Sequence, residues 1–277
     1  MPRTVWFPGH MARGTRQMEA LSKQLDLVLE VRDARAPRLS SSPVLGLFSG
    51  FRVWTILSKS DLADPTVTKK WLEAFKKEGK IAWAMDLHKG IPPAFRKHLL
   101  ALKPAFRELR LAVVGTPNVG KSMLLNQLVG RKAAPVGGIP GITRGVSWFK
   151  GQGFLVVDSP GILDPHSDAR AHRMLSWIAS TRGQVIGSWE GHALECLSYF
   201  SRRGLLPKIE KTWNIPTDGT AEELLERIGR RLGKLASGGV VDKEAAGKML
   251  IESLSTGKIG GVSLEEPGER PPWEDLT

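Results

Sequence analysis

The chain has 277 residues, enough for one large domain or two moderate ones, and its 41% hydrophobic and 25% charged residues are ordinary for a globular protein. One cysteine, Cys196, excludes an intrachain disulfide and a cysteine zinc cluster, and no apolar run approaches the roughly 18 residues of a membrane span. The net charge of +12 favours polyanionic partners over a surface kept basic only for solubility. Since the N-terminus resembles neither a signal peptide nor a transit peptide, we expect a cytoplasmic protein with no membrane partner.

The first third of the chain alternates predicted helices and strands. The predicted elements are a basic helix at 11–24, strands at 25–31 and 52–57, a helix at 64–78, a strand at 81–84 and a helix at 91–102. The helix at 64–78 has an acidic cap, Asp64, followed by Pro65 in its first turn.

The same alternation continues beyond residue 110. A buried strand at 111–114 runs into a glycine-rich loop, a helix follows at 121–128, and two strands at 145–149 and 154–157 form a pair. This pattern predicts an α/β fold with a mainly parallel sheet covered by helices on both faces. In such sheets ligands bind beyond the carboxyl ends of the strands.

The loop at 115–122, Gly-Thr-Pro-Asn-Val-Gly-Lys-Ser, fits the Walker A pattern of a P-loop. Its glycines leave backbone N–H groups free to surround phosphate oxygens at a helix N-terminus. We expect Lys121 to reach the β- and γ-phosphates, as a catalytic group, and Ser122 to hold Mg²⁺. The cofactor-binding residues predicted here are Asn118, Val119, Gly120, Lys121, Ser122 and Met123.

Upstream of the loop, residues 58–61 read Ser-Lys-Ser-Asp and are related to the Asn/Thr-Lys-x-Asp element that recognises guanine. The carboxylate of Asp61 can accept hydrogen bonds from guanine N1–H and N2–H₂, whereas adenine offers no such pair of donors. Lys59 would lay its aliphatic stem along the base. Ser58 replaces the usual Asn or Thr, and its hydroxyl can tie this element to the phosphate loop. We expect the last guanine contact near residues 84–86.

Downstream of the loop, Gly141-Ile142-Thr143 and Asp158-Ser159-Pro160-Gly161 look like the two switch elements of a GTPase. Asp158 would reach Mg²⁺ through water, and the Gly161 N–H would reach the γ-phosphate. Thr143 would bind Mg²⁺ and nucleotide from a loop that the γ-phosphate orders. The guanine element thus precedes the phosphate loop, although it follows the loop in ordinary small GTPases. Such a permuted order is compatible with one site in space, since closely spaced chain termini tolerate relocation.

After about residue 183 the strand signals largely stop, and helices are predicted at 189–199, 220–237 and 242–254. The second begins with a capping box, Thr220 with Glu223. We expect a GTPase domain over 1–183, a small all-helical domain over 184–264 and a disordered acidic tail over 265–277. Basic residues that could line RNA phosphates, or equally a solvated helix face or loop, are Arg202, Arg203, Lys208, Lys211, Arg227, Arg230, Arg231 and Lys234.

With these motifs assembled, the chain resembles, nearly end to end, the YlqF/RbgA family of circularly permuted, ribosome-associated GTPases. The residues that carry the resemblance are Trp6-Phe7-Pro8-Gly9-His10-Met11-Ala12, Asp33-Ala34-Arg35-Ala36-Pro37, the nucleotide motifs and Ser237-Gly238-Gly239. The resemblance implies a GTPase that binds GTP, GDP and Mg²⁺ and acts in late assembly of the bacterial large ribosomal subunit. It also implies that the C-terminal helices contact ribosomal RNA. We expect a monomer.

Two further roles are carried over by position. Ile162 stands where many GTPases keep a water-orienting glutamine, and the resemblance implies His10 as the catalytic residue instead. A histidine can act near neutral pH. Asn118 matches an asparagine that supports a K⁺ ion beside the phosphates in related GTPases.

Two other classes of function stay open. Ile162 leaves room for an RNA-binding scaffold that senses nucleotide with negligible hydrolysis. A small-molecule kinase that uses ATP would need an acceptor site and would have no use for Asp61.

Overall fold

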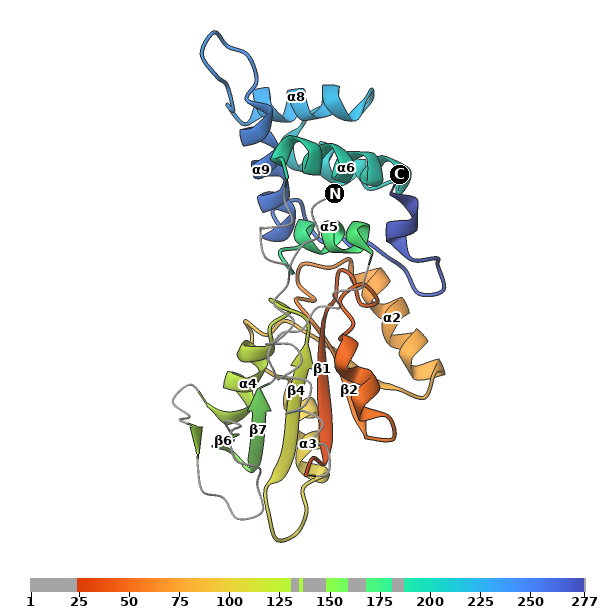
Figure 1. Ribbon diagram of the computed structural model, residues 1–277, viewed down its shortest axis with the longest axis vertical. Coiled ribbons are helices and arrows are strands. Elements are labelled where there is room, and N and C mark those ends of the chain that lie inside the picture. The colour runs from red at the N-terminus through yellow and green to blue at the C-terminus, as the bar shows by residue number, and fades with distance from the viewer. Residues whose placement is uncertain (1–23, 131–134, 137–147, 159–167, 181–186, 277) are drawn as a thin grey trace.

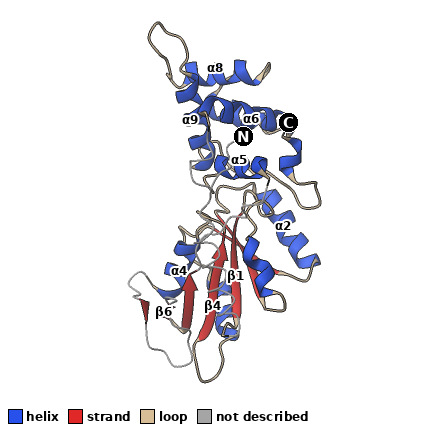
Figure 2. Ribbon diagram, in the orientation of Figure 1, coloured by secondary structure: helices blue, strands red, loops and turns tan. Residues whose placement is uncertain are grey.

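The computed structural model describes residues 24–130, 135–136, 148–158, 168–180 and 187–276. Within these residues a seven-stranded sheet occupies the lower part of Figure 1, and helices α5, α6, α8 and α9 gather in the upper part. Figure 2 shows the same division by colour, with red strands below and blue helices above. The helix predicted at 11–24 lies almost wholly outside the described residues.

The sheet has the order β3-β2-β1-β4-β7-β6-β5. Its strands are β1 (Leu27–Asp33), β2 (Val53–Ser58), β3 (Ile81–Met85), β4 (Leu109–Gly115), β5 (Pro135–Val136), β6 (Trp148–Gly151) and β7 (Phe154–Asp158). The five strands from β3 to β7 in this order are parallel, while β6 is antiparallel to both of its neighbours. The predicted mainly parallel sheet is therefore confirmed.

Alternate residues of the interior strand β1 face opposite sides of the sheet. Leu27 and Leu29 pack in the same hydrophobic cluster as residues of α3 (Pro93–Ala101) and α4 (Lys121–Val129). Val28 packs on the other side with the 3-10 helix η1 (Pro43–Phe48). On that side Leu57 packs with α2 (Pro65–Lys77), which begins at the predicted Asp64 cap. The prediction of helices on both faces is confirmed.

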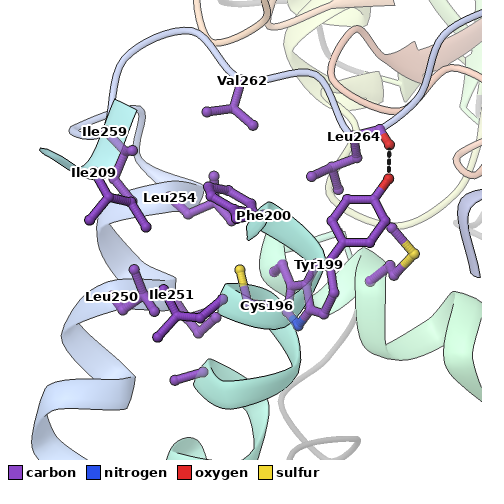
Figure 3. Packing of buried hydrophobic residues seen from close by; sticks show 14 of the residues in the cluster. Cys196, Tyr199, Phe200, Ile209, Leu250, Ile251, Leu254, Ile259, Val262 and Leu264 are labelled. Atoms are coloured by element: carbon purple, nitrogen blue, oxygen red, sulfur yellow. Dashed lines mark hydrogen bonds between the residues drawn. The ribbon is translucent and has the colours of Figure 1, made fainter. Parts of the chain in front are cut away.

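The upper part of the molecule is a bundle with its own hydrophobic core. Its elements are α5 (Ala169–Trp177), α6 (Trp189–Arg202), α7 (Leu206–Trp213), α8 (Ala221–Arg231), α9 (Lys243–Ser255) and the 3-10 helix η3 (Pro272–Asp275). Figure 3 shows part of the core, where the Tyr199 hydroxyl donates to the Leu264 carbonyl. The same core includes α5, although α5 precedes the expected domain boundary at residue 183. None of the helices in the described part of the chain is long and apolar enough to cross a membrane.

Helix α8 begins with the predicted capping box but ends six residues earlier than the predicted helix, at Arg231 rather than 237. Gly233 adopts a left-handed conformation with a φ of 65°, and the Lys234 N–H bonds back to the Gly229 carbonyl. This glycine-based C-cap terminates the helix.

The tail from Glu265 is packed, and the expectation of a disordered tail was wrong. Glu265 is fully buried and accepts the backbone N–H of Leu39, and Leu276 is buried in the core of the helical bundle. Composition suggested disorder because the tail is acidic, but its charges pair specifically with basic residues elsewhere. The pairs are Lys70 with Glu266 and Arg203 with Glu269.

Candidate nucleotide-binding site

Four neighbouring parallel strands end at the same edge of the sheet, and each end is followed by a predicted site residue or motif. β2 ends at Ser58, β1 at Asp33, β4 at Gly115 and β7 at Asp158. In Figure 1 these ends point towards α5 and the helical bundle. Motifs far apart in the sequence therefore meet at one edge, as expected for ligand sites in parallel sheets.

The loop between β4 and α4 is wound as a phosphate-binding loop requires. Gly120 has a φ of 100° and Asn118 a φ of 57°, so both lie in the left-handed region. A Cβ atom at Gly115 would lie 2.4 Å from the Val31 carbonyl oxygen, so the backbone of the loop approaches β1 too closely for a side chain. These conformations aim successive N–H groups into one concavity at the N-terminus of α4.

Lys121 is buried, and its ammonium curls back over the loop to donate to the Thr116 carbonyl at 2.7 Å. Burial lowers the pKa of Lys121 to about 8, against the opposing effect of the Asp158 carboxylate. Ser122, next along the chain, is exposed in the first turn of α4. A buried ammonium beside an exposed hydroxyl is the arrangement that receives a phosphate chain with its metal ion.

Asp158 lies opposite this lysine with an unsatisfied oxygen. Its Oδ1 atom is buried and has no hydrogen-bond partner in the structure. Burial raises the pKa of Asp158, although the charge of Lys121 opposes the shift. A buried carboxylate that lacks a donor fits a cation or a cation-bound water at this point.

Beside the phosphate loop lies a cavity of about 390 Å³, within the roughly 300–1,000 Å³ range of small-molecule sites. Five of the predicted cofactor-binding residues line it: Ser58, Lys59, Asp61, Gly120 and Met123. We call this hollow the base cavity. The Ser58 hydroxyl contacts the Val119 carbonyl, so the predicted tie between the guanine element and the phosphate loop is confirmed.

Six of the remaining residues that line the base cavity were missed by the sequence analysis: Leu87, His88, Ile178, Ala179, Ser255 and Thr256. Leu87 and His88 follow β3, which pairs with β2 so that Met85 lies beside Ser58. They take the place expected for residues 84–86, and the neighbouring strand end was the signal that could have found them. The other four come from the ends of α5 and α9, for which the sequence holds no signal.

Three predicted site residues, His10, Thr143 and Gly161, lie outside the described residues, as does Ile162. Asn118, the predicted K⁺ residue, donates its side-chain N–H to the Ala179 carbonyl at 3.1 Å. This bond ties the phosphate loop to the segment that follows α5.

Some of the basic residues considered for RNA binding are engaged within the protein. Lys208 donates to the Gly261 carbonyl, Arg231 donates to the Trp213 carbonyl, and Arg227 pairs with Asp218. Arg230 pairs with Glu226 along the exposed face of α8. Exposed pairs of this kind exchange readily for phosphate contacts, since each is worth little in water.

Known proteins are similar to this chain in sequence and in architecture. Residues 110–186 match the family described as "50S ribosome-binding GTPase". Ribosome biogenesis GTPase A of Thermotoga maritima is 36% identical over 275 residues, which cover 98% of this chain and 95% of that protein. The protein of the same name from Priestia megaterium is 32% identical, covering 95% of this chain and 97% of its own.

Solved structures agree with the sequence comparison. A GDP-bound structure of TM YlqF matches with a TM-score of 0.70 at 32% identity, covering 92% of this chain and 100% of that chain. GNP-bound YlqF from T. maritima matches with a TM-score of 0.65 at 31% identity, covering 93% and 100%.

Proposed function

The chain belongs to the ribosome biogenesis GTPase A (YlqF/RbgA) family, and we propose that it is a GTP-hydrolysing switch that binds the large ribosomal subunit and promotes its late assembly. GTPase activity and a place in ribosome assembly follow from family membership. The observation that best supports the site is the meeting of the base cavity with Lys121 and Asp158 at one sheet edge.

On the phosphate side, Lys121 would leave the Thr116 carbonyl and donate to the β- and γ-phosphates. Ser122, Thr143 and Asp158 would hold Mg²⁺, with Asp158 acting through water. When bound, this ion neutralises charge that develops on the phosphates. The unpartnered Asp158 oxygen supports this assignment.

On the base side, Asp61 would accept the two guanine N–H groups and Lys59 would cover the ring with its stem. Asp61 is exposed at the rim of the base cavity, where a base can reach it. Met123 from the first turn of α4 and Leu87 would supply apolar surface to the base.

The hydrolytic step rests on residues assigned by resemblance. His10 would orient the attacking water in place of the glutamine that Ile162 replaces, and the Gly161 N–H would hold the γ-phosphate. Asn118 would support a K⁺ ion beside the phosphates. We propose further that the protein is a cytoplasmic monomer whose helical bundle contacts ribosomal RNA.

Recognition of guanine by Asp61 is tested by the substitution Asp61→Asn. An amide in place of the carboxylate should weaken GTP binding about a hundredfold and favour xanthosine triphosphate, whose extra carbonyl accepts the new N–H. Competition between the two nucleotides against labelled GDP measures the change. A variant that still prefers GTP, or a wild type that binds ATP equally well, would refute the assignment.

The partner is tested by GTP hydrolysis in K⁺ buffer, alone and with purified large or small ribosomal subunits. We expect slow turnover alone and stimulation by the large subunit only. His10→Ala should lose most of the stimulated turnover while it retains nucleotide binding. Single-turnover assays that show no hydrolysis in any of these mixtures would favour the nucleotide-sensing RNA-binding scaffold.

A further inference from the structure

We propose that Arg35 is a positioning residue of the guanine site: it holds the C-terminal ends of α5 and α9 against the base cavity, so that the helical bundle supplies one wall of that cavity. Guanine binding and docking of the bundle on the sheet are then coupled. This inference rests on the proposed function, because it assumes that guanine occupies the base cavity.

The Arg35 side chain joins three parts of the chain at a fully buried point. Its guanidinium donates to both carboxylate oxygens of Asp33, at 2.9 and 2.8 Å. It also donates to the Ile178 carbonyl at the end of α5 and to the Ser255 carbonyl at the end of α9, both at 3.0 Å. Only a planar fork with five N–H donors can make all of these bonds together. Carbonyls at helix C-termini carry partial negative charge and favour such a cation.

The Asp33 carboxylate that pairs with Arg35 also contacts the guanine element. Lys59 Nζ lies 3.0 Å from Asp33 Oδ2, so one buried carboxylate aligns both Arg35 and the lysine proposed to cover the base. Lys59 has a φ of 54°, an uncommon conformation for a lysine. Asp33 thus fixes the direction of Lys59 on one side and the attachment of the bundle on the other.

The residues that Arg35 holds continue directly into the wall of the base cavity. Ile178 and Ala179 after α5, and Ser255 and Thr256 at the end of α9, line it opposite the guanine element. The sheet domain therefore contributes only part of the enclosure around the proposed base.

The segment that follows α9 is hydrogen-bonded to residues 62–64, which come directly after the guanine element. The Val262 N–H donates to the Leu62 carbonyl at 3.0 Å, and the Asp64 N–H donates to the Ser263 hydroxyl at 3.1 Å. Gly261 packs so closely that a Cβ atom there would lie 2.5 Å from the Ala63 carbonyl oxygen. Two independent attachments, Arg35 and this segment, thus hold the bundle to the loop that carries Asp61.

Coupling follows from this shared wall. A base bound in the cavity gains contacts only when α9 is docked, so docking must raise guanine affinity and guanine must stabilise docking by the same factor. Gly120 of the phosphate loop also lines the cavity, but the side-chain hydrogen bonds of Arg35 go to Asp33 and to the ends of α5 and α9 and not to this loop. The affinity of the loop for phosphate alone should therefore not depend on Arg35.

The test uses the full-length protein and two probes, fluorescent GDP and inorganic pyrophosphate with Mg²⁺ as competitor. Arg35→Ala should weaken GDP binding about tenfold, the change that corresponds to one lost net hydrogen bond, and leave pyrophosphate affinity unchanged. Arg35→Lys should lose about threefold, because an ammonium can pair with Asp33 but cannot span both helix ends.

Gly261→Ala supplies a second route that leaves Arg35 in place, in case Arg35→Ala does not fold. The methyl group of the new alanine should push this segment away from residues 62–64. It should therefore weaken GDP binding without affecting pyrophosphate binding. Gly46→Ala is the matched control, since Gly46, like Gly261, is outside the left-handed region but no atom lies within 4 Å of the new methyl.

Folded Arg35→Ala and Gly261→Ala proteins with wild-type GDP affinity would overturn the proposal, as would an equal loss of GDP and pyrophosphate. Asp61→Asn in the same assay separates a failure of the proposed guanine site from a failure of the proposed role of Arg35. If that variant keeps its preference for GDP, guanine does not bind where we place it, and the role of Arg35 fails with it. If it changes its preference while Arg35→Ala binds normally, only the role of Arg35 is refuted.

Discussion

The two sides of the candidate site are built in contrasting ways. The phosphate side is formed mostly by one short stretch, residues 115–122, with Asp158 from the neighbouring strand. The base side is assembled from the ends of β1, β2 and β3 together with the ends of α5 and α9. A local loop needs only its own backbone geometry, whereas an assembled cavity requires the whole tertiary structure, so the base side is the one that can respond to the helical bundle.

If the phosphate side is self-contained, its loss should abolish binding whatever the state of the bundle. Lys121→Ala removes the buried ammonium and should weaken GTP and GDP on the order of a hundredfold. Titration calorimetry measures the change. Lys150→Ala, an exposed lysine paired with Glu108, is the control and should bind as the wild type does. Near-normal affinity in Lys121→Ala would show that phosphates bind elsewhere.

On the base side, the segment that attaches α9 beside Asp61 continues into Glu265, whose side chain is fully buried. Burial raises the pKa of Glu265 from its ordinary 4.5 to about 7, with the backbone N–H groups of Leu39 and Arg38 opposing. The native state therefore favours the protonated acid, and its contribution to stability is lost as pH rises from about 4.5 to about 7. Glu265→Gln should remove this loss and gain on the order of 2 kcal/mol over the wild type at pH 8.

Urea unfolding at pH 5 and pH 8 measures that gain. Glu266→Gln, one residue further along and paired with Lys70 at the surface, should show no comparable rise between the two pH values. An advantage of Glu265→Gln that is equal at both pH values would contradict the linkage.

The Ser58 hydroxyl is the contact between the two sides. Ser58→Ala leaves the buried Val119 carbonyl without its donor and should weaken GDP about tenfold, by disturbing the phosphate loop from the base side. Fluorescent GDP binding checks the loss, and Ser60→Ala, the same change two residues away, should have little effect. Unchanged affinity in Ser58→Ala would mean that the two sides are independent.

The smallest expected effect is a pH dependence confined to the phosphate side. Phosphate should raise the pKa of Lys121 from about 8 in the free protein, so binding favours the charged lysine. GDP affinity should then fall about fourfold between pH 7 and pH 8.5, as the free lysine loses its proton. Lys121→Ala, which has no ammonium to titrate, should bind weakly without this fall. A flat wild-type profile would show that Lys121 is fully charged before binding.

The same contrast explains which features could be predicted from the sequence. The sheet, the phosphate loop and the strand-end positions of Ser58 and Asp158 follow from local patterns, and the structure has them where expected. Leu87 and His88 line the base cavity because β3 pairs with β2, and their position after a strand end was the one local signal that pointed to them. Ser255 and Thr256 reach the base cavity only through tertiary packing.

The expectation that the tail is disordered was wrong for the same reason, because its packing depends on tertiary contacts. Glu265 is buried because backbone donors of Arg38 and Leu39 are in place to receive it, and composition alone does not reveal those partners. An acidic composition predicts disorder only where the folded protein offers no hydrogen-bond donors or basic side chains to pair with the acidic groups.

The strand order has a consequence for folding of the nascent chain during translation. β4 lies between β1 and β7, yet β1, β2 and β3 are synthesised before it. Until Leu109–Gly115 emerges, one edge of the apolar strand β1 has no neighbour, and such an edge invites pairing with other chains. Translation therefore passes through a stage with an open sheet edge, which closes only when the strand leading into the phosphate loop is inserted.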